Sequence, residues 1–283
     1  MNSRGYWDSE WPSDKPVGVL RIVVLSDSVG IGTGPYEEKF LTLLEARLND
    51  RYTRPTVEVL NLGIPGTSPP EYALLLAEKW KPLEGDLAIV CFSVADDLIS
   101  PPPSESMRDP RGWRLAQAAL QLWDLGLRRA RESRDPTRRE REEARARIEA
   151  GILRKDALTD SAAERREKSW EYTLAFFDKM REISGGRLII FNIPEEVQVR
   201  SAKLERMLES AGLSRDDVDL YDPQTRVREH GEKILTPVCD VTTSLSVEEE
   251  KGTPTFDAEG KNLNAAGHKA AAFNLDMCVN AIR

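Results

Sequence analysis

Short apolar runs rich in β-branched residues recur along the chain, and segments with helical spacing of apolar positions separate them. These runs predict strands at 20–25, 57–61, 87–93, 187–192 and 236–241. The run 87–93, LAIVCFS, is apolar on both faces, as is typical of a buried parallel strand. The spacing of Phe40, Leu44 and Leu48 predicts a helix after the first strand, and further helices are expected at 71–80 and 264–282.

Strands that alternate with helices predict an α/β fold with a parallel sheet and right-handed crossovers. In such sheets, ligands bind at the carboxyl ends of the strands. The loops that begin at Ser26, Leu62 and Val94 follow the first three strands. We therefore expect these three loops to line the functional site.

The stretch 101–170 interrupts the alternation and turns helical and highly charged. It follows the breaker SPPPS, and it holds eleven Lys or Arg and seven Asp or Glu between Arg128 and Asp156. Its first helix has an apolar face made by Trp113, Ala116, Leu120, Trp123 and Leu127. We interpret it as a helical insertion within a single domain of residues 1–283: either a solvated hairpin, or a lid or partner surface.

Composition excludes several classes of protein. The chain has 283 residues, 40% of them hydrophobic, and a net charge of −8, which disfavours nucleic acid as the main partner. No apolar run is long enough to span a membrane. The beginning, MNSRGYWDSEWPSDKP, has no apolar core of a signal peptide, so a cytoplasmic protein is expected. No motif indicates a cofactor, and the oligomeric state stays open.

Cysteine and histidine are scarce. Cys91, Cys239 and Cys278 are too few and too scattered for a disulfide framework or a zinc site, so we expect core thiols in a reducing compartment. His230 and His268 are the two histidines, and any chemistry that needs an imidazole must use one of them.

The three loops contain residues suited to acyl chemistry. Ser28 lies at a strand-to-helix turn, where it is either a nucleophile or part of a simple Ser/Asp helix cap with Asp27. The second loop, Asn61-Leu62-Gly63-Ile64-Pro65-Gly66, allows a backbone N–H to approach a ligand, or only makes a turn. The third loop places Asp96 and Asp97 just past a strand.

In block order and spacing, these motifs resemble the SGNH/GDSL hydrolases, a family of flavodoxin-like serine esterases, lipases and carbohydrate deacetylases. The matching blocks are Ser26-Asp27-Ser28, Asn61 through Gly66, Val94-Ala95-Asp96-Asp97 and Asp257 through His268. The resemblance implies a three-layer sandwich with a five-stranded parallel sheet. It also implies that Ser28 is the nucleophile and that the N–H groups of Ser28 and Gly63 are oxyanion donors.

The sequence departs from the family at the catalytic block. Aligning Leu263-Asn264 and Gly267-His268 places Asn262 on the catalytic histidine, and Glu259 or Gly260 on the catalytic aspartate. Asp257 is two or three residues too early. An amide cannot usefully accept the proton of a serine hydroxyl. In the third block Asp96 replaces the asparagine donor, and an ionised carboxylate would repel an oxyanion.

Other bases and other histidines remain as alternatives. Asp257, Glu259, Asp96 and Asp97 could supply a carboxylate with a raised pKa, and Lys261 qualifies only if it is buried. His268 is expected to pack or to cap the start of the last helix. His230 is expected at an exposed helix end.

Three hypotheses follow. The first is a serine esterase or acyl transferase that uses Ser28 and a non-standard base on a small acyl or glycan-like substrate. The second is an inactive SGNH-like domain that binds a ligand or protein partner in the old cleft. The third is an enzyme of another class that uses Asp96 and Asp97, with or without a metal ion.

Overall fold

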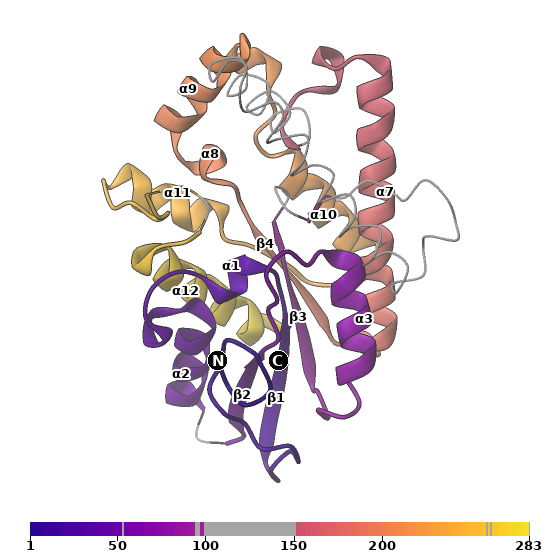
Figure 1. Ribbon diagram of the computed structural model, residues 1–283, viewed down its shortest axis with the longest axis vertical. Coiled ribbons are helices and arrows are strands. Elements are labelled where there is room, and N and C mark those ends of the chain that lie inside the picture. Colours follow the sequence, from indigo (N-terminus) through magenta and orange to yellow (C-terminus); the bar gives the residue numbers. More distant parts are fainter. Residues whose placement is uncertain (53, 94–96, 99–150, 259, 261, 283) are drawn as a thin grey trace, which may run out of the picture.

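Five parallel strands form one sheet in the computed structural model, in the order β2-β1-β3-β4-β5 (Figure 1). Their bounds are β1 Val19–Leu25, β2 Thr56–Asn61, β3 Leu87–Ser93, β4 Leu188–Ile193 and β5 Val238–Asp240. The structure describes every residue except 53, 94–96, 99–150, 259, 261 and 283. The predicted parallel sheet is confirmed. Its order is the flavodoxin-like one, in which the chain reverses direction across the sheet between β1 and β3.

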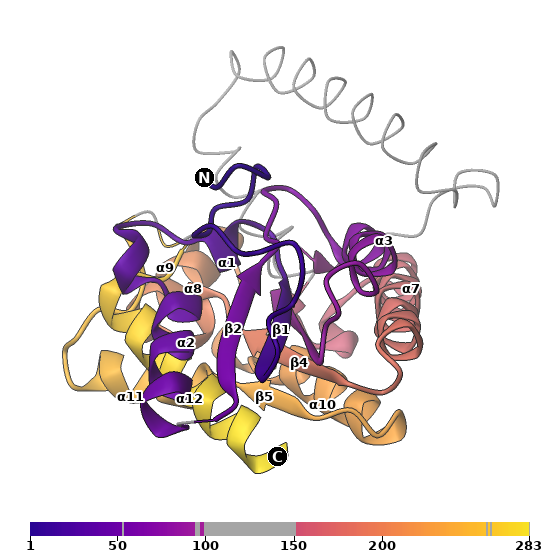
Figure 2. The ribbon, with the colours of Figure 1, turned by 90° about the horizontal axis from the view of Figure 1, so that it is seen from below.

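Helices cover both faces of the sheet and complete the three layers (Figures 1 and 2). On one face lie α2 (Phe40–Arg51), α11 (Thr242–Glu250) and α12 (Ala265–Ile282). On the other lie α3 (Pro69–Lys79), α7 (Asp160–Ile183) and α10 (Asp222–Lys233). Alternate residues of each strand enter the two cores: Ile22 and Val24 face α2 and α12, whereas Val23 and Leu25 face α3 and α7.

Shorter elements connect these layers. They are α1 (Ser28–Ile31), η1 (Tyr36–Glu38), η3 (Lys155–Ala157), α8 (Glu196–Val199), α9 (Ser201–Ala211) and η4 (Arg215–Asp217). A third apolar cluster joins α9 to the chain before α7, through Leu204, Leu208, Ile152 and Leu153.

Helix α7 is a core element that connects β3 to β4. It buries Trp170, Phe177 and Met180 against the sheet and packs beside α3. The expected end of the insertion, residue 170, falls in the middle of this continuous helix. The charged hairpin and its apolar face from Trp113 to Leu127 lie outside the described residues.

Two of the three cysteines are joined, which corrects the expectation of three core thiols. Cys239 of β5 and Cys278 of α12 form a disulfide across a Cα–Cα distance of 6.1 Å. The sequence hides this pair because 39 residues separate two positions that the packing of α12 beside β5 brings together. Cys91 is free and buried, as expected. Because Cys239 and Cys278 are joined, they do not support the expected reducing compartment.

None of the helices in the described part of the chain combines the length and the apolar character needed to cross a membrane.

Candidate functional site

The loops after β1 and β2 are tied together at the carboxyl edge of the sheet. Val24 is paired with Asn61 and Leu25 with Val90, so β1, β2 and β3 end side by side. Beyond the strands, the Ile64 N–H donates to the Ser26 carbonyl at 3.0 Å. The topology thus brings the first two predicted loops to one place, next to the point where β3 ends.

Ser28 is the first residue of α1, directly after β1. Asp27 caps this turn, because its Oδ1 accepts a hydrogen bond from the Val29 N–H at 2.9 Å. Asp27 is buried, whereas Ser28 is half-buried. The Ser28 hydroxyl lies 3.5 Å from Asp27 Oδ2, a long contact. Asp27 is therefore the residue that caps α1, and the Ser28 side chain does not act as the cap.

Asn61 connects the two loops. Its Nδ2 donates to the Gly30 carbonyl at 3.0 Å, and its Oδ1 accepts from the Gly63 N–H at 2.9 Å. A Cβ at Gly63 would lie 2.6 Å from Ser26 Oγ, and one at Gly30 would lie 2.0 Å from the same oxygen. Close packing therefore requires both glycines. The Gly63 N–H already has an acceptor, so it can serve an oxyanion only by sharing its hydrogen.

Asp97 braces the end of β3. It is fully buried, and its two oxygens accept from the Ser93 N–H at 2.9 Å and from the Tyr72 hydroxyl at 2.8 Å. Burial, followed by the Asp97 charge, raises the pKa of Tyr72 well above its usual value. Asp96 lies outside the described residues. Among the described residues, no group of three or more His, Cys, Asp or Glu is placed to hold a metal ion.

The last block forms a tight turn before α12. The Asp257 N–H donates to the Asn262 carbonyl at 2.8 Å, and Asn262 Nδ2 donates to Asp257 Oδ2 at 3.4 Å. Asp257 is thus in contact with Asn262, the residue that the sequence resemblance aligns with a catalytic histidine. Glu259 and Lys261 lie outside the described residues, and Gly260 adopts a positive φ of 69°.

His268 packs inside the protein. Its ring is fully buried, stacks on Phe40 with centroids 5.9 Å apart and lies against Gly32, where a Cβ would come within 2.4 Å of it. Burial, and then the charge of Lys39, lowers its pKa to about 4, a shift that the Thr33 backbone opposes. His268 is therefore a neutral packing group beneath the turn that carries Ser28, in line with the packing role expected of it.

His230 lies in the last turn of α10, with its Nε2 3.0 Å from Asp178 Oδ1 of α7. The described hydrogen bonds of Ser28 include neither histidine.

Sequence reasoning missed Asp8. Its Oδ2 accepts from the Asn61 N–H and its Oδ1 from the Tyr36 hydroxyl, both at 2.9 Å. The carbonyl of Trp7 also accepts a long bond of 3.5 Å from Asn61 Nδ2. No periodic pattern marks the first sixteen residues, and 53 positions separate Asp8 from Asn61. The contact exists only because the segment folds over the end of β2.

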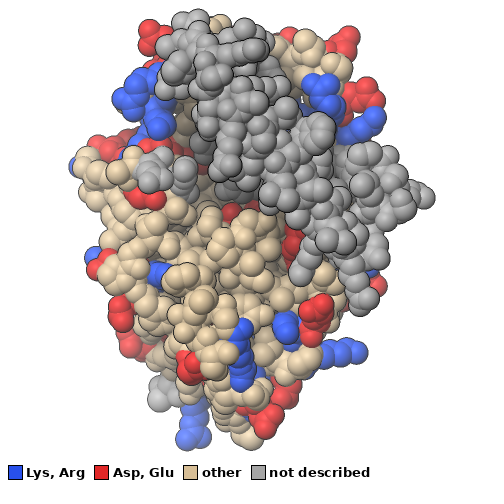
Figure 3. All heavy atoms as spheres, viewed as in Figure 1, with Lys and Arg blue, Asp and Glu red and all other residues tan. Residues whose placement is uncertain are grey.

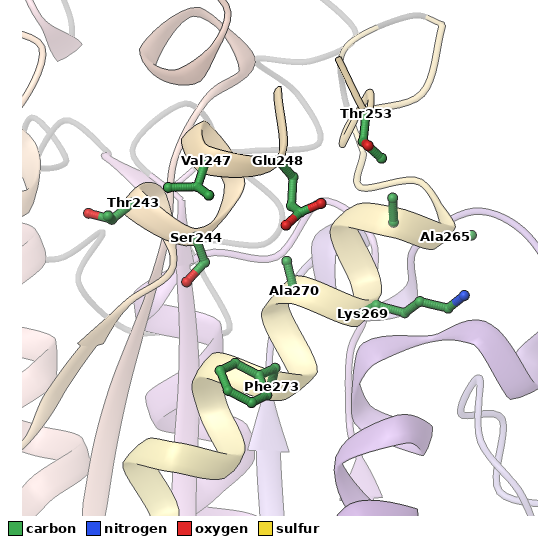
Figure 4. A pocket seen from close by; sticks show the side chains of 10 residues that line it. Thr243, Ser244, Val247, Glu248, Thr253, Ala265, Lys269, Ala270 and Phe273 are labelled. Atoms are coloured by element: carbon green, nitrogen blue, oxygen red, sulfur yellow. The ribbon is translucent and has the colours of Figure 1, made fainter. Parts of the chain in front are cut away.

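A groove of about 810 Å³ lies elsewhere, between α11 and α12 (Figure 4). Val247, Ala270 and Phe273 line it, with Glu248 and Lys269 among its polar residues. None of its lining residues comes from the loops after β1, β2 or β3. This groove is therefore separate from the candidate site.

Charged side chains are unevenly distributed over one face of the described surface. In the view of Figure 1, the middle of the described surface consists mostly of uncharged side chains, while Lys, Arg, Asp and Glu gather toward its rim (Figure 3).

Solved structures with the same architecture include hydrolases. LAE5, an alpha/beta hydrolase from the metagenome of Lake Arreo, matches with a TM-score of 0.52 and 15% identity over 93% of this chain and 96% of its own. A catalytic mutant of Axe2, an acetylxylan esterase from Geobacillus stearothermophilus, matches with a TM-score of 0.53 and 10% identity over 93% of this chain and 95% of its own. The sequence itself matches no family model and no curated protein.

Together with the strand order, these matches show that the chain shares the α/β fold of these hydrolases, with a five-stranded parallel sheet.

Proposed function

We propose that the protein hydrolyses or transfers acyl groups, with Ser28 as the nucleophile and a carboxylate in place of the usual imidazole. The observation that carries this proposal is the turn after β1. There a buried, capping Asp27 holds a half-buried serine beside the loop of Gly63. A serine presented at this edge of the sheet has the position that nucleophilic catalysis requires.

The proton acceptor must come from the acidic residues near the site. The Asn262 amide cannot accept the serine proton, whereas Asp27 Oδ2 lies 3.5 Å from the Ser28 hydroxyl. The other candidate proton acceptors are Asp257 and Glu259, which the sequence places shortly before α12. A carboxylate is a weaker base than imidazole at neutral pH, so we expect slow turnover that favours esters with good leaving groups.

The substrate class that we propose is an acyl or glycan-like ester. The structural neighbour Axe2 is an acetylxylan esterase, which agrees with a small acyl group on a sugar.

A second candidate function is binding without catalysis, with a ligand or a protein partner at the same loops after β1 and β2. The contact between Asn262 Nδ2 and Asp257 Oδ2 favours it, because an amide takes the place of a proton-accepting imidazole. Under this alternative, Ser28 would contact the ligand without reacting.

Substitution of Ser28 by alanine tests the proposal. On a panel of p-nitrophenyl acyl esters, we expect Ser28→Ala to lower kcat/KM by about 10²-fold or more, because the nucleophile is removed. Ser210→Ala is the matched control, since Ser210 lies exposed on α9 and bonds its own helix. Equal turnover by Ser28→Ala and the wild type would exclude Ser28 as the nucleophile.

A further inference from the structure

We propose that Asp8 is a positioning residue for the Ser28 site and that it acts through Asn61. The inference rests on the proposed function, because it assigns a role in the reactivity of that serine. Asp8 lies in the segment before β1, which the loop motifs do not include.

The first step is the contact between Asp8 and the end of β2. Asn61 is the last residue of β2, and its backbone N–H donates to Asp8 Oδ2 at 2.9 Å. The other carboxylate oxygen accepts from the Tyr36 hydroxyl at 2.9 Å and from the Ser9 N–H at 2.8 Å. With both oxygens bonded, the Asp8 carboxylate is held in one orientation.

The second step leads from Asn61 to the reacting loops. The Asn61 side chain bonds the Gly30 carbonyl, two residues after Ser28, and the Gly63 N–H, the oxyanion donor that the family resemblance implies. Asp8 fixes the backbone of Asn61, and the Asn61 amide fixes the distance between these two loops. A shift of about 1 Å in such a constellation can cost about 10²-fold in rate.

The segment also has anchors of its own. Trp11 is buried in the core beside α3 and pairs with Tyr6, with ring centroids 5.7 Å apart. The Arg4 guanidinium lies 5.5 Å from the centroid of the Trp11 ring, and Asn2 is buried. Loss of the Asp8 carboxylate therefore leaves the segment attached and Asn61 paired in the sheet, and it removes the acceptor of the Asn61 N–H. A substitution of Asp8 can therefore test its positioning role without unfolding the segment.

The burial of Asp8 and its hydrogen bonds have opposite effects on its carboxylate. Burial raises the pKa of Asp8, while the hydrogen bonds from Asn61, Tyr36 and Ser9 oppose the shift. A partly buried carboxylate that loses these donors would be costly to keep.

The experiment compares Asp8→Ala, Asp8→Asn and Glu10→Ala. Glu10 lies exposed in the same segment and bonds only to Ser3 among the described residues, so it is the matched control. The readouts are the second-order rate constant for covalent labelling by a fluorophosphonate, kcat and KM for a p-nitrophenyl ester, and hydrogen exchange of the Asn61 and Gly63 amides.

We expect Asp8→Ala to lower the labelling rate and kcat about 10-fold or more with KM nearly unchanged, and to speed exchange at Gly63. Asp8→Asn keeps an acceptor for the Asn61 N–H, and its amide can donate to the Tyr36 hydroxyl oxygen. The Ser9 N–H loses Asp8 Oδ1 and keeps only its 3.3 Å bond to the Tyr36 hydroxyl, so we expect this variant to stay within about 3-fold of the wild type. Should Asp8→Ala fail to fold, Tyr36→Phe replaces it: loss of the hydroxyl that orients Asp8 should slow labelling about 3-fold.

Wild-type labelling and turnover in Asp8→Ala, or an Asp8→Asn variant as slow as Asp8→Ala, would overturn the inference. In the replacement case, wild-type labelling by Tyr36→Phe would overturn it too. If wild-type Ser28 is itself unreactive, the proposed function fails, and amide exchange alone decides the role of Asp8. In that case, Gly63 exchange that is equal in Asp8→Ala and Glu10→Ala would refute the link through Asn61.

Discussion

At the scale of single residues, the pair of Asp257 and Asn262 bears on which group could accept a proton in the proposed reaction. Their side chains are in contact at 3.4 Å, with the amide as donor and the carboxylate as acceptor. An imidazole at position 262 could make the same contact and still accept a proton on its other nitrogen. The Asn262 amide donates to Asp257 in this way but offers no nitrogen that could accept a proton.

This arrangement predicts a gain of function. We expect Asn262→His to raise kcat/KM for p-nitrophenyl esters by about 10²-fold, the usual contribution of a general base. The same substitution in a Ser28→Ala background should bring no gain, which makes the double variant the control. A folded Asn262→His protein no faster than the wild type would show that position 262 does not face the nucleophile.

His268 predicts a pH dependence of stability. Its pKa is about 4 in the folded protein and near 6.5 in the unfolded chain, so protons bind the unfolded chain more readily. The stability that its neutral form supports is complete above pH 6.5, and about 3 kcal/mol is lost as the pH falls from 6.5 to 4. Urea unfolding at pH 7 and pH 4 measures this loss.

His268→Phe should remove this part of the pH dependence, because phenylalanine keeps the stack on Phe40 without titrating. His230→Asn, on α10, should retain it. An equal loss in wild type and His268→Phe would assign the acid sensitivity to other groups.

The sequence predicts single residues well where a motif is local. Ser28 with its capping Asp27, and the turn from Asn61 to Gly63, lie within a few positions of a strand end, so spacing alone places them. Asp8 and the contact of Asp257 with Asn262 could not be predicted in the same way. They depend on how a segment folds over a strand and on how tightly one loop closes.

At the scale of elements, buried strands were the most predictable feature. The predicted run 87–93 matches β3, and 20–25 and 57–61 differ from β1 and β2 by one residue, because each is a short run rich in β-branched apolar residues that ends at a loop. Helix α11 (Thr242–Glu250) had no such signal, since only Thr242 and Leu245 are buried along it. The pairing of β5 with α12 through a disulfide was missed for a related reason: it joins two elements that pack only in the finished fold.

The disulfide predicts sensitivity to reductant. It closes a loop of 39 positions, so its loss should cost about 3–4 kcal/mol and lower Tm by several degrees. Differential scanning calorimetry with and without dithiothreitol measures the change. Cys278→Ser is the control, because reductant should leave its Tm unchanged. Three alkylatable thiols in the unreduced, denatured wild type would contradict the bond.

At the scale of the whole molecule, the strand order β2-β1-β3-β4-β5 explains why the site lies where it does. The order brings the ends of β1, β2 and β3 together, and the loops that follow carry the candidate nucleophile, the bridging asparagine and the buried Asp97. The fold and this edge follow from the pattern of strands. The proton acceptor does not follow from this pattern, because no strand end marks which carboxylate would take the proton of Ser28.

Covalent labelling tests the central claim, that Ser28 is a nucleophile, most directly. The protein is incubated with a fluorophosphonate, its intact mass is measured, and the modified peptide is identified. The account predicts one adduct on the wild type, located at Ser28, and none on Ser28→Ala. A wild-type protein that stays unmodified would contradict the claim and favour ligand binding without catalysis, whereas an adduct that persists on Ser28→Ala would contradict it by placing the reactive nucleophile elsewhere.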